Sequence, residues 1–352
     1  MLFPQNNSKT KTIIFLIVFS ISHALVDASC ALLILGSKEL RENILNYIIL
    51  YNVCAFGLQA FFGMMIDKYN QPKFFSFLGI LLLISAFAFV RNPLTMVLLA
   101  GIGNASFHIG GGYVALNIDK DKALYPAIFV APGGIGLAIG IYLSKLNFDY
   151  LYLLFPILLS AMLLIIILNK LPTVTKIKKP EKAEKLIWMI ILLILISITV
   201  RALIGSSIKF PWKSDLSLFV ILTLAIASGK LLGGILADKF GWMKPGLLGL
   251  LLSIPLLSFG YTNPVIGLVG ICIFNFSMPI TLTAISKSLP GRAGLSFGLT
   301  TMALLIGALP TFSSLKYLIR NEWIVFTLIS ISAFAFYLGL KFTLKKLLQS
   351  EN

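Results

Sequence analysis

Long apolar runs separated by short polar connections dominate the sequence. Twelve runs can be counted, each near the ~20 residues that an α-helix needs to cross ~30 Å of hydrocarbon. The predicted spans are 12–36, 43–66, 73–90, 93–117, 124–144, 148–170, 186–206, 215–237, 243–260, 264–286, 292–315 and 322–343. Because only helices satisfy their own backbone hydrogen bonds in such segments, the pattern predicts an all-α membrane protein with twelve transmembrane helices.

The longest polar connection lies at the midpoint of the chain. It runs from Leu171 to Lys185, LPTVTKIKKPEKAEK, and is rich in lysine and proline. Such a composition is typical of a tether between domains. We therefore expect a six-helix bundle over 1–170, a cytoplasmic linker over 171–185 and a second six-helix bundle over 186–352.

Composition and charge agree with a membrane location. Hydrophobic residues make up 58% of the chain and charged residues 12%, which excludes an ordinary soluble globule. The net charge of +16 does not indicate a nucleic-acid binder, because the basic residues fall between the apolar runs. More than twice as many lie in segments on the side of the N-terminus as on the other side. By the positive-inside rule, we expect a multi-pass protein of the plasma membrane with both termini in the cytoplasm.

The cysteines add no further class of function. Cys30, Cys54 and Cys272 all lie inside apolar runs and form no C-x-x-C pair. Neither a disulfide framework nor a zinc site follows from them. The first apolar run is too long for the core of a signal peptide, so we expect it to be retained as a helix.

A short motif recurs at matching places in the two halves. GGILADKFG begins at Gly233, a weaker copy, GMMIDKYN, begins at Gly63, and their aspartates are separated by nearly half the length of the chain. This spacing indicates a duplicated, pseudo-symmetric unit. Glycine allows helices to approach closely, an aspartate at the membrane edge can accept hydrogen bonds from a helix N-terminus, and a lysine favours the anionic cytoplasmic surface. The residues predicted to act in these gating loops are Gly63, Asp67, Lys68, Gly234, Asp238 and Lys239.

The repeated motif resembles a known family signature. The pattern G-x-x-x-D-[RK]-x-G is similar to the loop after the second, and less well kept after the eighth, helix of the major facilitator superfamily. The first copy departs from it, with Asn70 and Gln71 where the later glycine is expected. The resemblance implies two six-helix bundles that rock around a central site.

Further segments resemble narrower groups of that family. GNASFHIGGG (103–112), QAFFG (59–63) and SHALVD (22–27) are similar to the fosmidomycin-resistance branch. APGGIGLAIG (131–140) resembles the glycine-rich helix between the bundles of facilitator-type exporters. The second resemblance implies efflux as the direction of transport.

Polar residues inside the apolar runs are the first candidates for function, because ionisable groups are costly in a bilayer. His23 and Asp27 are four residues apart on the first predicted helix, and Asn104 and His108 repeat that spacing on the fourth. The family resemblance implies that these two helices line a central cavity. We expect the four residues, with Asn275 on the tenth helix, to bind substrate or couple ions. The alternative is that each is held in a structural hydrogen bond.

Arg201 offers a second hypothesis. It follows Asp27 by almost the same offset as that between the two motif aspartates, which puts the two at equivalent positions of the first and seventh helices. We predict an ion pair between the halves that closes the outer side of the cavity. The alternative is that Arg201 extends to the outer headgroups.

The sequence thus predicts a secondary active transporter that moves a small organic solute by alternating access, coupled to protons and acting as an exporter. No G-x-x-x-x-G-K-[ST] is present to bind ATP. We expect a monomer in the lipid bilayer that is not an enzyme, with no cofactor and no nucleic-acid partner. Two alternatives stay open. One is a divalent transition-metal transporter with His23, Asp27, Cys30 and His108 as ligands, and the other is a membrane scaffold or sensor that transports nothing.

Overall fold

All secondary-structure elements of the described residues are helices. The computed structural model describes residues 5–146, 149–170 and 185–351. In these residues ten helices are long and apolar enough to cross a membrane, and Pro72–Ala88 and Met243–Ser258 are shorter apolar helices. The prediction of an all-α membrane protein whose segments fit a count of twelve transmembrane helices is confirmed.

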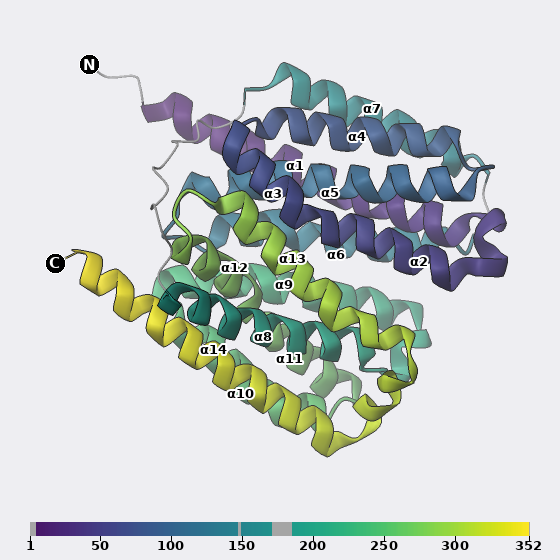
Figure 1. Ribbon diagram of the computed structural model, residues 1–352. Helices are drawn as coiled ribbons and strands as arrows, with labels where there is room; N and C mark the ends of the chain where they lie inside the picture. Colours follow the sequence, from purple (N-terminus) through teal and green to yellow (C-terminus); the bar gives the residue numbers. More distant parts are fainter. Residues whose placement is uncertain (1–4, 147–148, 171–184, 352) are drawn as a thin grey trace. The chain divides into compact units, whose positions relative to one another are not determined.

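Figure 1 labels the helices in chain order. The first seven are α1 (Gln5–Gly36), α2 (Ile44–Asn52), α3 (Leu58–Tyr69), α4 (Pro72–Ala88), α5 (Pro93–Ile118), α6 (Leu124–Leu143) and α7 (Leu151–Leu168). The other seven are α8 (Lys185–Ser207), α9 (Leu216–Phe240), α10 (Met243–Ser258), α11 (Pro264–Phe274), α12 (Ser277–Ser288), α13 (Ala293–Ala308) and α14 (Glu322–Glu351). Short 3₁₀ segments occupy Lys38–Asn43, Pro211–Ser214, Leu309–Phe312 and Ser314–Arg320.

Two of the predicted spans are interrupted helices. The second is α2, a π-helical turn over Val53–Gly57, and α3. The tenth is divided into α11 and α12 at Asn275 and Phe276. Pro279 explains the second break, because proline has no N–H to donate to the carbonyl of Asn275 four residues earlier and its ring crowds that carbonyl. A bend at this proline is what a cavity-lining helix can use.

The chain forms two compact units. Unit 1 consists of Met1–Asp119, Ile128–Lys176 and Ala293–Gly298, and unit 2 of Lys120–Ala127, Ile177–Arg292 and Leu299–Asn352. Most of each predicted bundle lies in one unit, with short pieces of α6 and α13 in the other. The predicted limits at 170 and 186 stay a prediction, and residues 171–184 of the predicted linker lie outside the described residues.

The same helix pairs recur in the two units. In unit 1, α1 packs against α5 and α7, and α4 packs against α5 and α7. In unit 2, α8 packs against α12 and α14, and α10 packs against α11 and α14. This repetition of neighbours is what duplication of one six-helix unit would produce.

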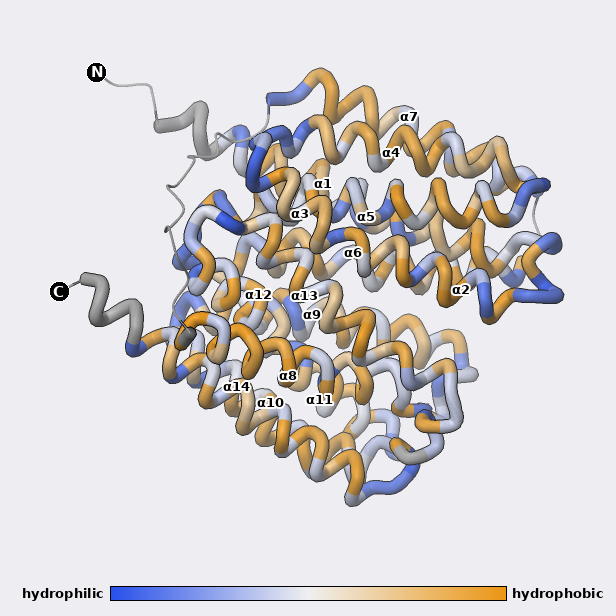
Figure 2. Tube along the Cα trace, in the orientation of Figure 1, coloured by the Kyte–Doolittle hydropathy of each residue, from blue (hydrophilic) through white to orange (hydrophobic). Residues whose placement is uncertain are grey.

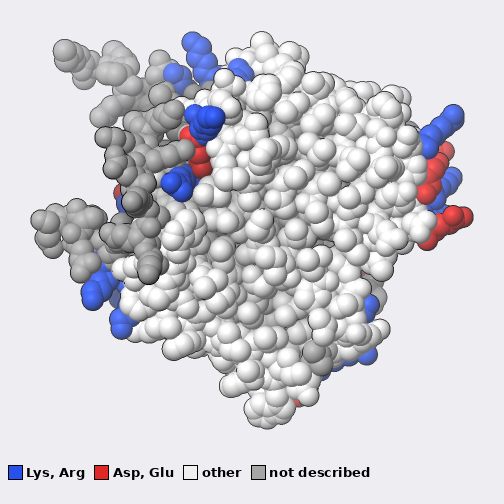
Figure 3. Space-filling view, in the orientation of Figure 1, with Lys and Arg blue, Asp and Glu red and all other residues white. Residues whose placement is uncertain are grey.

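The polarity of the surface follows the helix axes. Figure 2 shows apolar middles of the helices and hydrophilic residues near their ends. In Figure 3 the lysine, arginine, aspartate and glutamate side chains lie at these ends, and the broad band between them carries none. An uncharged band of this kind suits contact with hydrocarbon.

Candidate functional site: a histidine–aspartate cluster

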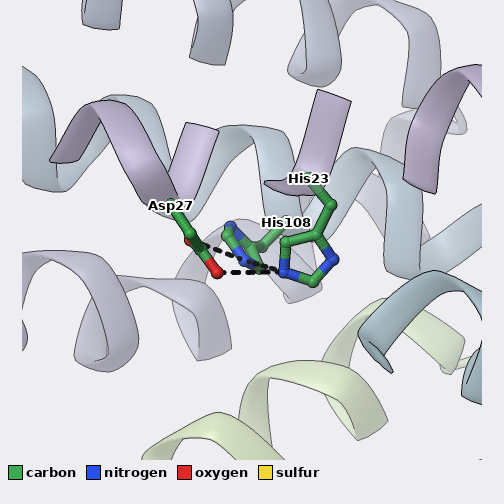
Figure 4. Close-up of side chains that lie close together, drawn as sticks. All are labelled: His23, Asp27 and His108. Atoms are coloured by element: carbon green, nitrogen blue, oxygen red, sulfur yellow. Dashed lines mark hydrogen bonds and ion pairs between the residues drawn. The ribbon is translucent and has the colours of Figure 1, made fainter. Parts of the chain in front are cut away.

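Three ionisable side chains meet inside unit 1. His23 and Asp27 lie one turn apart on α1, and His108 reaches them from α5 (Figure 4). The carboxylate of Asp27 lies 3.3 Å from His23 Nε2 and 3.5 Å from His108 Nε2. The two histidines are only 4% and 9% exposed. They therefore face the interior of the unit and not lipid.

The hydrogen-bond partners of the imidazoles fix their tautomers. His23 Nδ1 lies 2.6 Å from the carbonyl oxygen of Phe129, and His108 Nδ1 lies 2.8 Å from that of Asn104. Since a carbonyl oxygen only accepts, each Nδ1 carries a proton, and Nε2 of each neutral ring is then an acceptor. Both Nε2 atoms are consequently left to bind a cation.

The distance between the two Nε2 atoms is short enough for a proton to bridge them. His23 Nε2 and His108 Nε2 lie 2.7 Å apart, a hydrogen-bond distance. Two lone pairs repel at this separation unless a proton lies between them. A single proton shared between them would remove this repulsion, and the Asp27 carboxylate, 3.3 and 3.5 Å from the two nitrogens, could balance its charge.

The other predicted members of the cluster take supporting positions. Asn104 donates from Nδ2 to Asp27 Oδ1 at 3.0 Å, which joins α5 to α1 and orients the carboxylate. Cys30 contacts the carbonyl of Ala100 and the amide of Asn104, at 3.9 and 3.7 Å. Of the four predicted metal ligands, the structure brings His23, Asp27 and His108 within 4.8 Å of one another. Cys30 is not part of this group.

Gly133 belongs to the site, although no sequence pattern pointed to it directly. A Cβ atom there would clash with His23 Nε2 and lie 2.7 Å from Asp27 Oδ2. Gly133 lies in the glycine-rich segment 131–140 of α6, and only the structure identifies the side chains that use the space it leaves.

Unit 2 holds a buried charge of its own, Arg201 on α8, which is 8% exposed. Its Nη1 donates to Ser277 Oγ and its Nη2 to Thr281 Oγ1, both at 2.8 Å, and its Nε donates to the carbonyl of Ser197 at 3.3 Å. Arg201 thus lies inside its unit, and the alternative that it extends to the headgroups does not fit this burial. The predicted ion pair with Asp27 in the other unit stays a prediction.

The polar groups of the two units occupy equivalent sequence positions. Almost the same offset, close to half the chain, converts each position of unit 1 into its counterpart in unit 2: Asp27 into Arg201, Asn104 into Ser277, and His108 into Thr281. One arrangement therefore occurs twice, with a carboxylate in unit 1 and a guanidinium in unit 2. Ser277 and Thr281 as partners of Arg201 were missed from the sequence, although the offset alone points to them.

Asn275, the predicted site residue of the tenth helix, donates from Nδ2 to the carbonyl of Ile271 at 2.8 Å. It is partly exposed at the break between α11 and α12. Its role in binding substrate stays a prediction.

The first predicted gating loop is a helix cap. Asp67, at the end of α3, accepts hydrogen bonds from the backbone N–H groups of Gly294 and Leu295, at 2.8 and 2.9 Å. These groups begin α13, where a carboxylate also interacts favourably with the helix dipole. Gly63 allows the approach, since a Cβ there would clash with the backbone of Gly294.

The second loop repeats the arrangement in unit 2. Asp238, at the end of α9, accepts from the N–H groups of Ala123 and Leu124 at the start of α6, at 2.7 and 3.3 Å. Gly234 leaves room for Ala127. The offset between each donor and its counterpart in the first cap equals the offset between the two aspartates.

The lysines of the two loops also match. Lys68 and Lys239 are exposed, and their Nζ atoms lie 5.2 and 5.1 Å from the ring centroids of the next residues, Tyr69 and Phe240. The two lysines therefore occupy equivalent positions and make the same kind of contact with an aromatic ring.

The departure of the first motif from the family pattern has a simple backbone reason. Asn70 adopts a left-handed conformation with φ of 54° at the C-cap of α3, and Gly241, at the equivalent position of the second motif, also has a positive φ, 83°. Asparagine is one of the few residues that tolerate such a conformation. The Asn70 side chain also accepts a hydrogen bond from Tyr113 Oη at 2.9 Å.

Next to the second cap, the loop 119–122 carries the densest acidic sequence. Asp121 there forms an ion pair with Lys287 of α12. Partial burial, and then the nearby charge of Lys287, lower the pKa of Lys120. These contacts tie the loop to α12.

Comparisons with known proteins agree with this architecture. Its structure aligns with that of the human organic anion transporter MFSD10 (TETRAN) with a TM-score of 0.68 and 14% sequence identity. The alignment covers 93% of this chain and 99% of MFSD10. The alignment with the fucose:proton symporter FucP of E. coli has a TM-score of 0.65 and 13% identity, and it covers 94% of this chain and 98% of FucP. The alignment with a bacterial homologue of the iron transporter ferroportin, in an outward-facing state, has a TM-score of 0.59 and 14% identity. It covers 95% of this chain and 98% of that protein.

At these identities the structural likeness establishes the fold alone. Comparison with curated protein sequences gave no match, and the resemblance to the fosmidomycin-resistance branch is not confirmed. The family model described as Major Facilitator Superfamily matches residues 13–311, most of the chain. This chain is therefore a member of the Major Facilitator Superfamily.

Proposed function

We propose that this protein is a secondary active transporter that moves a small organic solute by alternating access and couples it to protons at His23, Asp27 and His108. The observation that carries the proposal is the 2.7 Å contact between two Nε2 atoms whose Nδ1 protons are already committed to carbonyls. A site that must hold a proton, and that lies in a membrane helix, is suited to release it to one side and regain it from the other.

The fold neighbours are consistent with this proposal. One of them, FucP, is named a proton symporter. The caps at Asp67 and Asp238 can form and break as the protein changes conformation, because each consists of two hydrogen bonds at the membrane edge. We further propose that the protein acts as a monomer in the plasma membrane, with both termini in the cytoplasm, as an exporter and not as an enzyme.

Transport of a divalent transition metal is the second candidate. Two imidazole Nε2 atoms and a carboxylate converge, and each Nδ1–H is held by a carbonyl, as in many metal sites. Zinc–nitrogen bonds of about 2.0–2.1 Å at a tetrahedral angle separate two ligand nitrogens by about 3.3 Å. The observed 2.7 Å is shorter, so a metal would require the rings to move apart, whereas a proton fits without change.

The test uses the fact that the chain contains only two histidines, both in this cluster. The protein, purified with a tag that lacks histidine, is labelled with ¹⁵N-histidine, placed in lipid nanodiscs and measured by NMR across pH. We expect ring nitrogens that share one proton, and we expect Asp27→Asn to change both rings. Asp149→Asn, at an exposed carboxylate, is the matched control and should change neither.

Two other results have defined meanings. Neutral rings at every pH, indifferent to Asp27→Asn, would contradict the proton site. Ring shifts that appear only with added Zn²⁺ or Mn²⁺ would favour metal transport. In proteoliposomes, solute accumulation driven by a pH gradient should be lost in Asp27→Asn, while a scaffold or sensor would show no flux to lose.

A further inference from the structure

The guanidinium of Arg201 is held in place but not neutralised within its unit. Its three hydrogen bonds go to two hydroxyls and one backbone carbonyl, all of which are uncharged. Among the described residues of unit 2, no carboxylate forms an ion pair with it. A buried cation in a membrane span is costly, and such residues commonly mark a substrate or ion pathway.

The hydroxyl partners act as fixed acceptors. Ser277 Oγ donates its own proton to the carbonyl of Phe274 at 3.2 Å. Thr281 Oγ1 lies 3.0 Å from the carbonyl of Ser277 and 2.9 Å from that of Met278. With their protons committed to carbonyls of α11 and α12, both oxygens present lone pairs to Arg201. The guanidinium is therefore oriented before any ligand arrives.

Donor counting shows what Arg201 still lacks. A guanidinium has five N–H donors, and three are used here, one on each nitrogen. One N–H remains on Nη1 and one on Nη2. Each of these N–H groups can donate to an oxygen of an anion, and one positive charge matches one negative charge.

Arg201 also occupies the unit 2 position that corresponds to Asp27, the carboxylate of the proton site in unit 1. On that basis we infer that Arg201 is the docking group for the carboxylate of the transported solute, which makes the cargo a monovalent organic anion. This inference rests on the proposed transport function and names its substrate class. The structural neighbour MFSD10 is described as an organic anion transporter, but the contacts of Arg201 carry the inference without it.

The experiment measures binding, so that it does not depend on transport. Purified wild-type protein is titrated with acetate, hexanoate, benzoate and nicotinate, each paired with its uncharged primary amide, with thermal unfolding and calorimetry as readouts. We expect at least one carboxylate to bind at least about tenfold more tightly than its amide, because a hydrogen bond to a charged group contributes about 1.5–3 kcal/mol. No such preference in any pair would overturn the inference, as would binding of methyl phosphate alone.

Variants separate a docking role from a structural one. Arg201→Gln should abolish the preference for carboxylate over amide, and Arg91→Gln, at an exposed arginine, should retain it. If Arg201→Gln does not fold, Thr281→Val keeps the charge but removes one acceptor that orients it, and should weaken carboxylate binding while the amide is unaffected. Unchanged carboxylate preference in either variant of the Arg201 site would refute the assignment.

Failure of this inference can be distinguished from failure of the proposed function. If a pH gradient drives uptake of a neutral or cationic solute and Arg201→Gln retains it, proton coupling stands and the anion site is wrong. If wild type binds a carboxylate through Arg201 but the histidine rings hold no shared proton, the anion site stands and the proton site is wrong.

Discussion

Replacing Gly133 with alanine tests whether the proton site depends on space left by a missing side chain. A methyl group at this position of α6 would point at the two α1 residues of the cluster. It would lie 2.7 Å from Asp27 Oδ2 and closer still to His23 Nε2, whereas ordinary van der Waals contact begins at 3.4 Å. The carboxylate must therefore move by about 0.7 Å, and the imidazole by more.

Gly133→Ala should lower the free energy of unfolding only modestly, although it displaces the side chains of the site. Crowding in a packed interior costs about 1–3 kcal/mol, and replacing glycine by alanine in a helix interior returns up to about 1 kcal/mol. We expect a net loss of at most about 2 kcal/mol for Gly133→Ala. Gly205→Ala on α8 is the matched control, since nothing lies within 4 Å of its added Cβ.

Two measurements on both variants decide the matter. The histidine NMR spectrum of Gly133→Ala should lose the signature of a shared proton, because the 2.7 Å contact of His23 Nε2 with His108 Nε2 cannot survive a shift of the His23 ring. Transport driven by a pH gradient should be lost with it, while Gly205→Ala keeps both. A folded Gly133→Ala protein with the wild-type spectrum and wild-type coupling would refute the assigned geometry.

Three further predictions concern the helix cap at Asp67, the thiol of Cys30, and the opposite charges of Asp27 and Arg201. Asp67→Ala should lower the thermal stability measured in detergent, because it removes two charge-assisted hydrogen bonds from α13 that are worth about 2–4 kcal/mol in total. Asp67→Asn should lose less stability, because asparagine still caps a helix. Equal losses in the two variants would contradict a role for the charge. Cys30→Ser should leave the histidine spectrum and any metal-induced shift unchanged, since Cys30 lies outside the group of converging ligand atoms; a lost metal response would restore it to the ligand set. Exchanging the charges, with Asp27→Arg and Arg201→Asp together, should restore transport lost in either single variant if the predicted ion pair exists, and the absence of any rescue would end that hypothesis.

The periodicity of the sequence was sufficient to predict the fold, and the spacing of residues within single helices was sufficient to predict part of the candidate site. Apolar runs long enough to cross a bilayer predicted the helices, and the separation of four residues predicted that His23 would lie beside Asp27, as it does at 3.3 Å. The helix caps at Asp67 and Asp238 were also foreseeable, because a carboxylate at a membrane edge can accept hydrogen bonds from a helix N-terminus and is stabilised by the helix dipole.

What the sequence could not supply were contacts set by packing between helices. The role of Gly133 depends on how closely α6 approaches α1, and no spacing within either helix encodes that distance. Packing between helices also explains why Cys30 is not part of the group of converging ligand atoms. Cys30 lies two helical turns after His23, where its thiol contacts the carbonyl of Ala100 on α5 and not the imidazoles. The alternative for Asn104, a structural hydrogen bond between helices, is present in the structure, and the same bond orients Asp27 for the proposed chemistry.

The repeat itself carries the last step of the argument. Duplication supplies each half with the same two helices packed in the same way, so that a polar group at one position of α1 or α8 meets groups one helix away on α5 or α12. In unit 1 the position holds a carboxylate beside two histidines, whereas in unit 2 it holds a guanidinium with two hydroxyl acceptors. An ancestral pair of identical sites can therefore diverge by a few substitutions into one site for a cation and one for an anion. That division fits a carrier in which proton and solute occupy different halves, and it explains why opposite charges occupy equivalent positions.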